Sequence, residues 1–361
     1  AVSFSPSLSS AVEHDHVQPV GQSQTINGVT LKLNYLIVDQ RQLNLFYTVT
    51  CEDNAVVQAV LDCQVTSPGL TDYSIYYGSA ASVGQLDYFT LDFAQGDMPS
   101  QLDLVLSVLT LTDSQASYDL SAQPSAQFSF HLEFDPTLTV QGETYSLNQT
   151  LTLDGQKICL DQLELYPTHA RLVFHGGEGN DWLLTGLSFY LEDGDGIRYL
   201  PEGGLAGRGD GLNGGQLERR TASPWFSKSN SLTLFVTGAS WLDEAHSTVQ
   251  VDLAAGTAQG LPQGFVFSGA RRDDGSPEDL VLMFQGPPVP KGEAVLIPFR
   301  YQYLDPHGQL GSITSGGAGT GSDDSASYHL ILEDYSYDTV TLLLHETNRS
   351  LPDTPLEFSV K

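Results

Sequence analysis

Hydrophobic and polar residues alternate along most of this chain, and one pair of hydrophobic runs occurs three times. The first runs of the three pairs begin at Leu45, Leu172 and Leu282. The spacings from these residues to Leu104, Leu234 and Leu342, which lie inside the second runs, are 59, 62 and 60 residues. A repeat at this spacing indicates a tandem array of similar units. The second runs cover residues 102–106, 232–236 and 340–344.

Each unit is predicted to end on a strand in which apolar and polar residues alternate strictly. These closing strands are residues 128–134, 249–253 and 356–360. Strict period-two alternation is typical of a strand with one buried face, and no window shows a sustained helical period. Short strands separated by Gly, Asn, Asp and Ser turns predict an all-β fold. We expect tandem immunoglobulin-like β-sandwiches, each burying alternate side chains between two sheets.

The repeat divides the chain into three sandwiches and one short leading segment. We expect the sandwiches at residues 17–136, 137–255 and 256–361, stacked as a semi-rigid rod. In the leading segment, residues 1–16, Ser5 suits a helix cap and Pro6 the first helical position. Two glycine-rich segments, 203–215 and 311–327, lack a packing pattern and are predicted to be mobile loops.

The charge balance narrows the class of partner. The chain has 15 Lys and Arg against 44 Asp and Glu, which gives a net charge of −29. It therefore lacks the cations that drive binding to nucleic acid or anionic lipid. A basic partner, or one bridged by a divalent cation, remains open. No apolar run approaches the roughly 18–20 residues that a membrane helix needs, so this stretch of chain is expected to be soluble.

Three cysteines are too few for a scaffold built on disulfides. If residues 52–55 form a turn, Cys51 faces Val56 and Cys63 lies further along an extended strand. Their separation would then be roughly 23 Å at the usual rise per residue. A disulfide requires Cα atoms within about 7 Å. We therefore predict that Cys51 and Cys63 are not bridged to each other.

Asp193 and Asp195 are the candidate metal ligands, because they place carboxylates close together in a short acidic turn. Calcium needs about six or seven oxygen ligands, and the spacing of a helix–loop–helix calcium loop is absent here. An Asp-Gly hairpin turn explains the same residues more simply. Calcium is the one cofactor the sequence leaves open.

Trp182, Trp225 and Trp241 all fall in the second unit and are the candidate binding residues. Three exposed Trp side chains would form a platform on which sugar rings stack, whereas Trp side chains between two sheets would belong to the core. Arg208-Gly209-Asp210 spells an integrin-binding tripeptide in a glycine-rich segment, where such short matches arise by chance.

No catalytic set is apparent. The chain contains no Gly-x-Ser-x-Gly elbow, no glycine-rich phosphate loop and no His-Glu-x-x-His sequence. Its nine His are scattered, and carboxylate pairs among 44 acidic residues cannot be placed from sequence. The sequence therefore predicts a protein that is not an enzyme.

Several stretches resemble a family of Firmicute ectodomains called domain of unknown function 4179. Residues 27–31, 36–39 and 43–49 resemble the first module of that family. Residues 5–12 resemble the segment that follows its single membrane helix. Residues 159–168, followed by Arg171 and Leu172, resemble the opening of the immunoglobulin-like partner domain found next in those proteins.

The resemblance implies a membrane-anchored, anti-sigma-factor-like regulator whose sandwiches lie at the extracytoplasmic face of the plasma membrane. We expect a non-catalytic sensing or interaction ectodomain whose partner is a macromolecule or wall polymer. The membrane would be reached only through an anchor outside this chain. The family defines no functional residues. The alternative is a cell-surface adhesin or carbohydrate-binding array that uses exposed Trp and loop residues.

Overall fold

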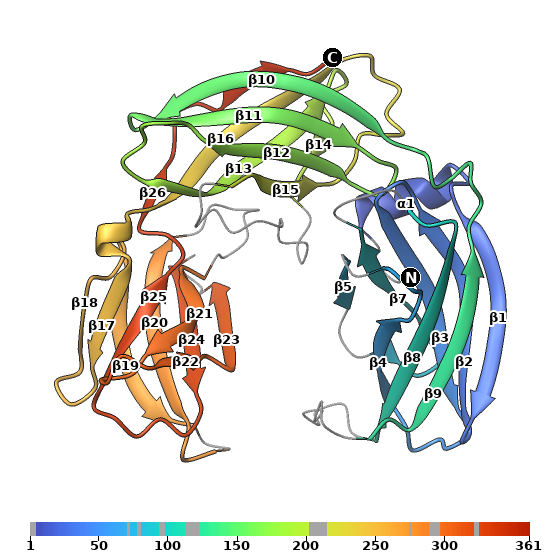
Figure 1. Ribbon diagram of the computed structural model, residues 1–361, viewed down its shortest axis with the longest axis horizontal. Helices are drawn as coiled ribbons and strands as arrows, with labels where there is room; N and C mark the ends of the chain where they lie inside the picture. The colour runs from blue at the N-terminus through green and yellow to red at the C-terminus, as the bar shows by residue number, and fades with distance from the viewer. Residues whose placement is uncertain are drawn as a thin grey trace.

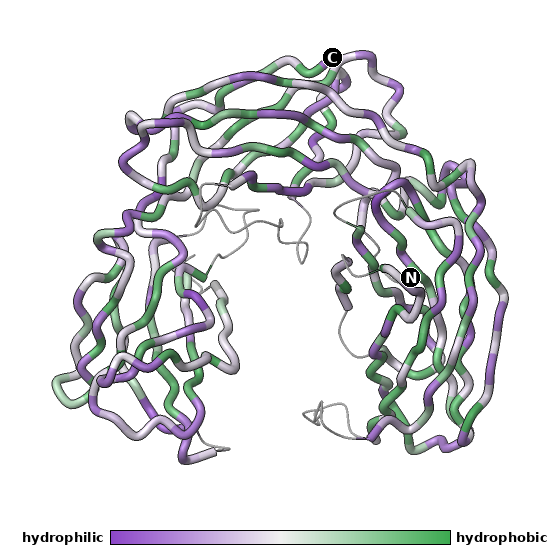
Figure 2. Tube along the Cα trace, in the orientation of Figure 1, coloured by the Kyte–Doolittle hydropathy of each residue, from purple (hydrophilic) through white to green (hydrophobic). Residues whose placement is uncertain are grey.

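A computed structural model describes residues 5–70, 73–77, 81–93, 98–112, 123–201, 215–273, 276–288, 297–320 and 325–361. Within these ranges, six antiparallel sheets form three β-sandwiches, so the predicted all-β sandwich fold is confirmed (Figure 1). The sandwiches were expected to stack as a semi-rigid rod, and in Figure 1 they follow an arch. Figure 2 shows hydrophobic and polar residues alternating along the strands.

The helix predicted at the start of the chain is present as α1, Pro6–Glu13. Ser5 is its N-cap, and the Ser5 hydroxyl accepts a hydrogen bond from the Leu8 N–H at 3.3 Å. Pro6 occupies the first turn, where its missing N–H leaves no intrahelical bond unmade. Leu8 and Ala11 are buried against the outer face of the first sandwich, which fixes the helix there.

The first sandwich places two sheets face to face, with the alternating apolar residues between them. One sheet has the order β1 (Gln18–Ile26), β2 (Val29–Val38), β3 (Gln42–Cys51), β7 (Leu86–Asp92), β5 (Ser74–Tyr77). The other has the order β6 (Ala81–Ser82), β4 (Gln58–Val65), β8 (Gln101–Leu111), β9 (Ala126–Glu133).

The prediction that Cys51 and Cys63 are unbridged is confirmed, because both are free. The reason differs from the expected one. Cys51 ends β3 and pairs with Val29, whereas Cys63 lies on β4 in the facing sheet. The chain crosses between the sheets after Cys51 instead of forming a hairpin with the next strand.

The second sandwich repeats this arrangement. One sheet has the order β10 (Glu143–Leu153), β11 (Gln156–Leu165), β12 (Ala170–Gly176), β15 (Leu217–Thr221). The facing sheet has the order β14 (Arg198–Tyr199), β13 (Leu183–Asp193), β16 (Leu232–Leu242). Beyond β16 lie two strands from the end of the chain, β26 (Asn348–Ser350) and β27 (Leu356–Ser359).

The third sandwich also has two sheets. The first has the order β18 (Thr257–Gln259), β17 (Thr248–Asp252), β25 (Thr339–Leu344), β21 (Phe299–Leu304), β22 (Leu310–Ser312). The second has the order β19 (Val266–Arg272), β20 (Leu280–Pro288), β24 (Ser325–Leu332), β23 (Ser315–Thr320).

The glycine-rich segment 311–327 was predicted as a loop, and where it is described this is wrong, because it forms β23 and parts of β22 and β24. The glycines allow close packing between neighbouring strands. A Cβ on Gly317 would lie 2.2 Å from Cε1 of His329 on the adjacent strand. Apart from Gly215, the other glycine-rich segment, 203–215, lies outside the described residues.

The expected closing strands of the second and third sandwiches have exchanged places. β17 pairs with β25 of the third sandwich, where Val249 lies opposite Leu342. β27 pairs with β16 of the second sandwich, where Phe358 lies opposite Leu234. Residues 248–252 therefore leave the unit they were expected to close, and residues 356–359 complete it instead. Both strands alternate in the same way, so the pattern alone does not select the partner strand.

As a result, a two-stranded antiparallel ribbon runs through both sandwiches. One side of the ribbon consists of β16 and then β17. The other side consists of β25, β26 and β27 in chain order. Where the ribbon crosses between the sandwiches, the Thr347 N–H donates to the Trp241 carbonyl at 2.7 Å. The indole N–H of Trp241 donates to the Ser350 hydroxyl at 2.8 Å.

This assignment predicts that a change in β27 destabilises the second sandwich. Phe358 packs half-buried against the core of that sandwich, so Phe358→Ala should lower the free energy of unfolding by about 1.5–2.5 kcal/mol, half the cost at a fully buried site. All three Trp pack in that same core, so urea unfolding followed by Trp fluorescence reports on it.

The control is Glu357→Ala on the same strand, where the side chain is exposed. We expect its unfolding curve to match the wild type within about 0.5 kcal/mol. A Trp-monitored transition that is unchanged by Phe358→Ala would contradict the placement of β27 in the second sandwich.

Candidate functional site: the junction of the first two sandwiches

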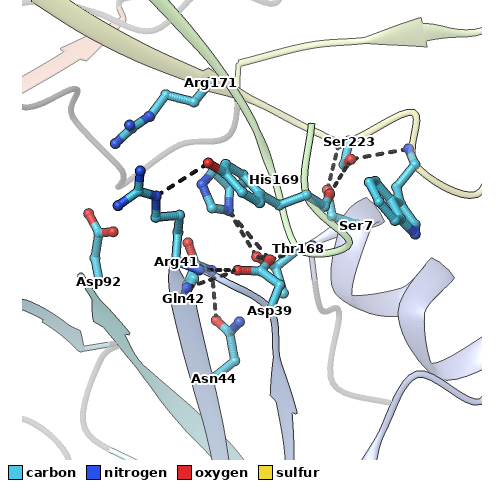
Figure 3. A network of polar contacts seen from close by, with 12 residues as sticks. Ser7, Asp39, Arg41, Gln42, Asn44, Asp92, Thr168, His169, Arg171 and Ser223 are labelled. Atoms are coloured by element: carbon cyan, nitrogen blue, oxygen red, sulfur yellow. Dashed lines mark hydrogen bonds and ion pairs between the residues drawn. The ribbon is translucent and has the colours of Figure 1, made fainter. Parts of the chain in front are cut away.

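Two turns from different sandwiches meet at a buried junction (Figure 3). The first turn, Asp39-Gln40-Arg41, joins β2 to β3 of the first sandwich. The second, residues 166–169, joins β11 to β12 of the second sandwich. Asp39, Thr168 and His169 are each 1% exposed or less. A polar cluster this deeply buried persists only if its members satisfy one another.

The Asp39 carboxylate holds both turns. Its Oδ1 accepts the N–H groups of Arg41 and Gln42, each at 2.9 Å, which closes its own turn. Its Oδ2 accepts the Thr168 N–H at 3.1 Å and the Thr168 hydroxyl at 2.5 Å, across the junction. Burial raises the pKa of Asp39, and these hydrogen bonds oppose that rise.

A second contact across the junction joins opposite charges. Arg220 on β15 donates to the Asp92 carboxylate on β7 and to the Gln42 side chain at 3.2 Å. Arg220 and Asp92 are both buried. Removing one member of such a pair leaves an uncompensated buried charge, which is far more costly than the net gain from forming the pair.

Tyr166 extends the network into the second sandwich. Its hydroxyl accepts a hydrogen bond from Arg41 at 3.3 Å and donates to Glu164 at 2.7 Å. The Arg171 guanidinium forms ion pairs with the Glu164 carboxylate at 2.8 Å and with the Glu218 carboxylate at 3.1 Å. Charges from both sandwiches therefore alternate in sign through the junction.

Helix α1 lies across the same junction. Its residue Ser7 accepts a hydrogen bond from the Ser223 N–H of the second sandwich at 2.8 Å. Phe226 of that sandwich packs on the cluster formed by Leu8 and Ala11 with the first sandwich. The His14 ring stacks on the Phe226 ring with centroids 4.6 Å apart. The helix is thus held by both sandwiches at once.

The junction residues bond one another across the two sandwiches. Burial, helped by Arg220, Arg171 and Arg41, lowers the pKa of His169 well below its usual value, which favours the neutral ring. No described junction residue pairs an exposed nucleophile with a base. Three buried atoms, Asn44 Nδ2, Asp92 Oδ1 and His169 Nε2, have no hydrogen-bond partner within the described chain.

An open cleft lies between α1 and the second sandwich and has a volume of about 470 Å³. The helix contributes Pro6, Ser10 and His14 to it. The facing wall is formed by the β13–β14 turn and the segment after β15 and includes Asp195, Ile197, Tyr199, Ser223, Phe226, Ser227 and Lys228. The cleft therefore opens next to the junction and carries charges of both signs.

Asp193, a predicted calcium candidate, is bonded by its own hairpin and by Ser227 from the segment after β15. Its Oδ1 accepts the N–H groups of Asp195 and Ile197, and its Oδ2 accepts the hydroxyls of Tyr199 and Ser227. Burial opposes the charge, but these bonds hold the pKa of Asp193 below its usual value. Asp195 is exposed beside it. Within the described residues, no three His, Cys, Asp or Glu side chains gather as a metal site.

The candidate Trp residues do not form an exposed platform. Trp241 is fully buried in the core of the second sandwich. Trp182 and Trp225 are partly buried and pack against the same core. A sugar ring has no access to Trp241 while the sandwich is closed. Arg208-Gly209-Asp210 lies outside the described residues.

Side chains of β1 cover the free edge of β9 in the first sandwich. The amides of Gln18, Gln22 and Gln24 donate to the carbonyls of Glu133, His131 and Ser129 at 2.7, 3.0 and 2.7 Å. Asn27 continues the ladder to Ser125 at 3.0 Å. Backbone acceptors that would recruit an additional strand are thus already occupied. A shallow cleft of about 230 Å³ remains beside this ladder.

Residues 2–50 match the family described as "Domain of unknown function (DUF4179)". Residues 142–261 match the "Family of unknown function (DUF5643)". The expected resemblance to the first family is therefore supported over residues 2–50. The second match ends beyond β17 and β18, which pair within the third sandwich here.

A solved structure, "The crystal structure of the conserved domain protein from Bacillus anthracis", is 13% identical to this chain with a TM-score of 0.47. The alignment covers 63% of this chain and 79% of the other. No curated protein matches the chain. Among the described residues, no helix has the length and apolar character needed to cross a membrane.

The junction was not found from the sequence, because its residues follow ordinary strand and turn patterns. Asp39-Gln40-Arg41 resembles an exposed turn, and Gln42 and Asn44 occupy positions that face outward from the first sandwich. All of these except Gln40 and Arg41 are buried by neighbouring elements. Polar residues between the apolar positions of β3 are the only local signal, and any exposed strand carries the same signal.

We predict that Asp39→Ala lowers the free energy of unfolding by about 2–4 kcal/mol, because donors from both turns lose a buried acceptor. The matched control is Asp305→Ala. Asp305 accepts the N–H groups of His307 and Gln309, both at 2.8 Å, in a similar turn of the third sandwich. Within the described residues, Asp305 has no contact across a junction. We therefore expect Asp305→Ala to lower the free energy of unfolding by about 1 kcal/mol or less.

Urea unfolding followed by circular dichroism measures both variants. Equal losses for Asp39→Ala and Asp305→Ala would mean that Asp39 only closes its own turn and does not hold the junction.

A separate prediction concerns His131 on β9. The hydrogen bond from its ring to Asp103 at 2.7 Å raises the pKa of this exposed His. Folding therefore favours the protonated ring. The contribution of this contact to the free energy of unfolding is lost as the pH rises through the raised pKa. In an NMR titration, Asp103→Asn should lower the pKa of His131.

Glu133→Gln should change the pKa of His131 less, because that carboxylate lies 3.8 Å from the ring. A titration in which Asp103→Asn leaves the pKa of His131 unchanged would show that the contact does not persist in solution.

Proposed function

We propose that this chain is a non-catalytic interaction ectodomain of a single-pass, membrane-anchored regulator, and that the junction transmits binding to its N-terminal helix. The observation that carries the proposal is the position of α1, which both sandwiches hold. Ser7 is bonded to the second sandwich, and Leu8 and Ala11 are buried on the first. A change in how the two sandwiches meet must therefore alter the packing of α1.

The similarity of residues 2–50 to the DUF4179 family supports an extracytoplasmic place next to a membrane anchor, with α1 as the segment nearest to it. Suppose that the two sandwiches exchange between two arrangements and that a ligand binds one of them more tightly. The ligand then shifts the population of helix positions by an amount set by the difference between its affinities for the two arrangements. The buried polar contacts make such a change discrete, because a half-open junction would leave Asp39 and Arg220 unpaired.

The partner that fits this surface is a macromolecule or wall polymer. Both clefts are open to solvent, and the net charge of −29 favours a basic partner or one bridged by cations. Binding of this kind weakens as salt rises. The burial of Trp241 leaves the alternative, a sugar-binding array, without its central platform.

The test uses the complete parent gene in its own bacterium, with Asp39→Ala as the variant and Asp305→Ala as the control. If the junction transmits a signal, Asp39→Ala should change the transcript profile in the same direction as removal of the ectodomain. Asp305→Ala should leave it as in the wild type. A protease that does not enter cells is added to intact cells, and the amount of chain that it cleaves is measured. This measurement checks that the variants are equally abundant and face outward.

Unchanged transcripts in Asp39→Ala cells with wild-type surface abundance would overturn signalling through the junction. Protection of the chain from the added protease would overturn the extracytoplasmic location.

A further inference from the structure

The second sandwich is closed by the strand that lies farthest from it in the chain. In the first sandwich, β9 closes the sheet next to β8 and follows it directly. In the second, the corresponding place beside β16 is filled by β27, more than a hundred residues after β16. The strand that directly follows β16 is β17, which closes the third sandwich on β25. Two repeats have thus exchanged their closing strands within one chain.

The attachment of β27 is peripheral. Within the described residues, β27 pairs with β16 alone. Leu356, Phe358 and Val360 pack against the core of the second sandwich but are only partly buried. The Lys361 ammonium lies 5.5 Å from the centre of the Tyr145 ring. A strand held along one edge opens at lower cost than the strands inside the sheet.

The segment before β27 suits a hinge. Residues 351–355 form no strand or helix, and Leu351 is 61% exposed. Pro352 and Pro355 restrict the residues before them to extended conformations. The segment therefore resists folding into a tight turn and carries β27 away from β26.

We propose that the edge of β16, once its own β27 has left it, accepts the C-terminal strand of a second copy of this chain, and that two copies exchange β27 to form a strand-swapped dimer. The swapped contacts repeat those already present, with Phe358 opposite Leu234 and Leu356 opposite Val236. The partner is a second copy because its strand matches the apolar alternation and register of this edge. Only the hinge conformation differs between the monomer and the dimer.

Concentration decides between the two forms. The short hinge keeps β27 of the same chain at an effective concentration in the millimolar range. Exchange is therefore favoured when copies are crowded or refold together, and the closed monomer is favoured in dilute solution. The proposal does not depend on the proposed signalling function.

A disulfide trap tests the exchange. Thr233 lies opposite Ser359. The neighbouring pair is hydrogen-bonded, since the Val360 N–H donates to the Leu232 carbonyl at 2.8 Å, so Thr233 and Ser359 occupy the closer, non-hydrogen-bonded position. Chains carrying only Thr233→Cys are mixed with chains carrying only Ser359→Cys, unfolded together, refolded at near-millimolar concentration and oxidised.

We expect a covalent dimer in which mass spectrometry identifies a peptide joining positions 233 and 359. The control mixture combines Ser359→Cys with Lys32→Cys, an exposed cysteine on a strand of the first sandwich. It should give at least tenfold less cross-linked dimer. Equal cross-linking in both mixtures, or none in the first, overturns the proposal.

Hinge length gives an independent readout. Deleting Pro352, Asp353, Thr354 and Pro355 leaves two residue steps from Ser350 to Leu356, which span at most about 7 Å. Their partners Ala239 and Val236 lie about 10 Å apart along β16, so β27 cannot reach its place in its own chain and light scattering should show a dimer. Inserting four Gly and Ser residues at the same place should give a monomer. A shortened chain that stays monomeric would show that the released strand does not enter a second copy.

Discussion

The arrangement of the first two sandwiches depends on one buried carboxylate. Asp39 is removed from water completely, and its own turn supplies donors to one carboxylate oxygen only. The other oxygen is satisfied by the two donors of Thr168 from the second sandwich. Arg220 of the second sandwich and Asp92 of the first are also buried, and their opposite charges compensate each other across the junction. Hydrophobic contacts tolerate sliding, whereas these polar contacts are satisfied in one relative position of the two sandwiches. Helix α1 is then fixed by both.

The junction is selective rather than strongly stabilising. Buried ion pairs return little net free energy, because desolvation of the charges cancels much of their attraction. Asn44 Nδ2 and Asp92 Oδ1 add an uncompensated cost, since neither has a partner among the described residues. A junction of this kind separates at moderate cost yet closes in a single geometry. Those are the properties that a transmitting contact needs.

The sequence predicts the sandwiches well and their connections poorly. The alternation in β9 and β27 identifies strands because each faces one core, and Ser5 and Pro6 mark the start of α1. The alternation of Val249 and Val251 equals that of Leu356 and Phe358, so it does not reveal which sheet each strand joins. Pairing is decided by contacts between residues about a hundred positions apart, which no local pattern encodes.

The candidate site illustrates the same limit. Asp193 and the Trp residues were singled out by type, yet they serve a hairpin and a core. Asp39 and Asn44 attract no attention in the sequence, because a polar residue on a strand is normally exposed. Their importance arises only when a second sandwich and a helix cover the outer face of the first. Glycines in residues 311–327 mislead for a related reason, since they permit close strand packing as readily as they permit loops.

Hydrogen exchange at the Thr168 backbone N–H tests the central claim most directly, because that group donates across the junction to Asp39. If the junction fixes the two sandwiches, this amide should exchange as slowly as the amides of the neighbouring strands β11 and β12. The His307 N–H, which donates to Asp305 in an exposed turn, provides the reference for an unprotected turn. Exchange of Thr168 at the rate of His307 would show that the first two sandwiches move independently.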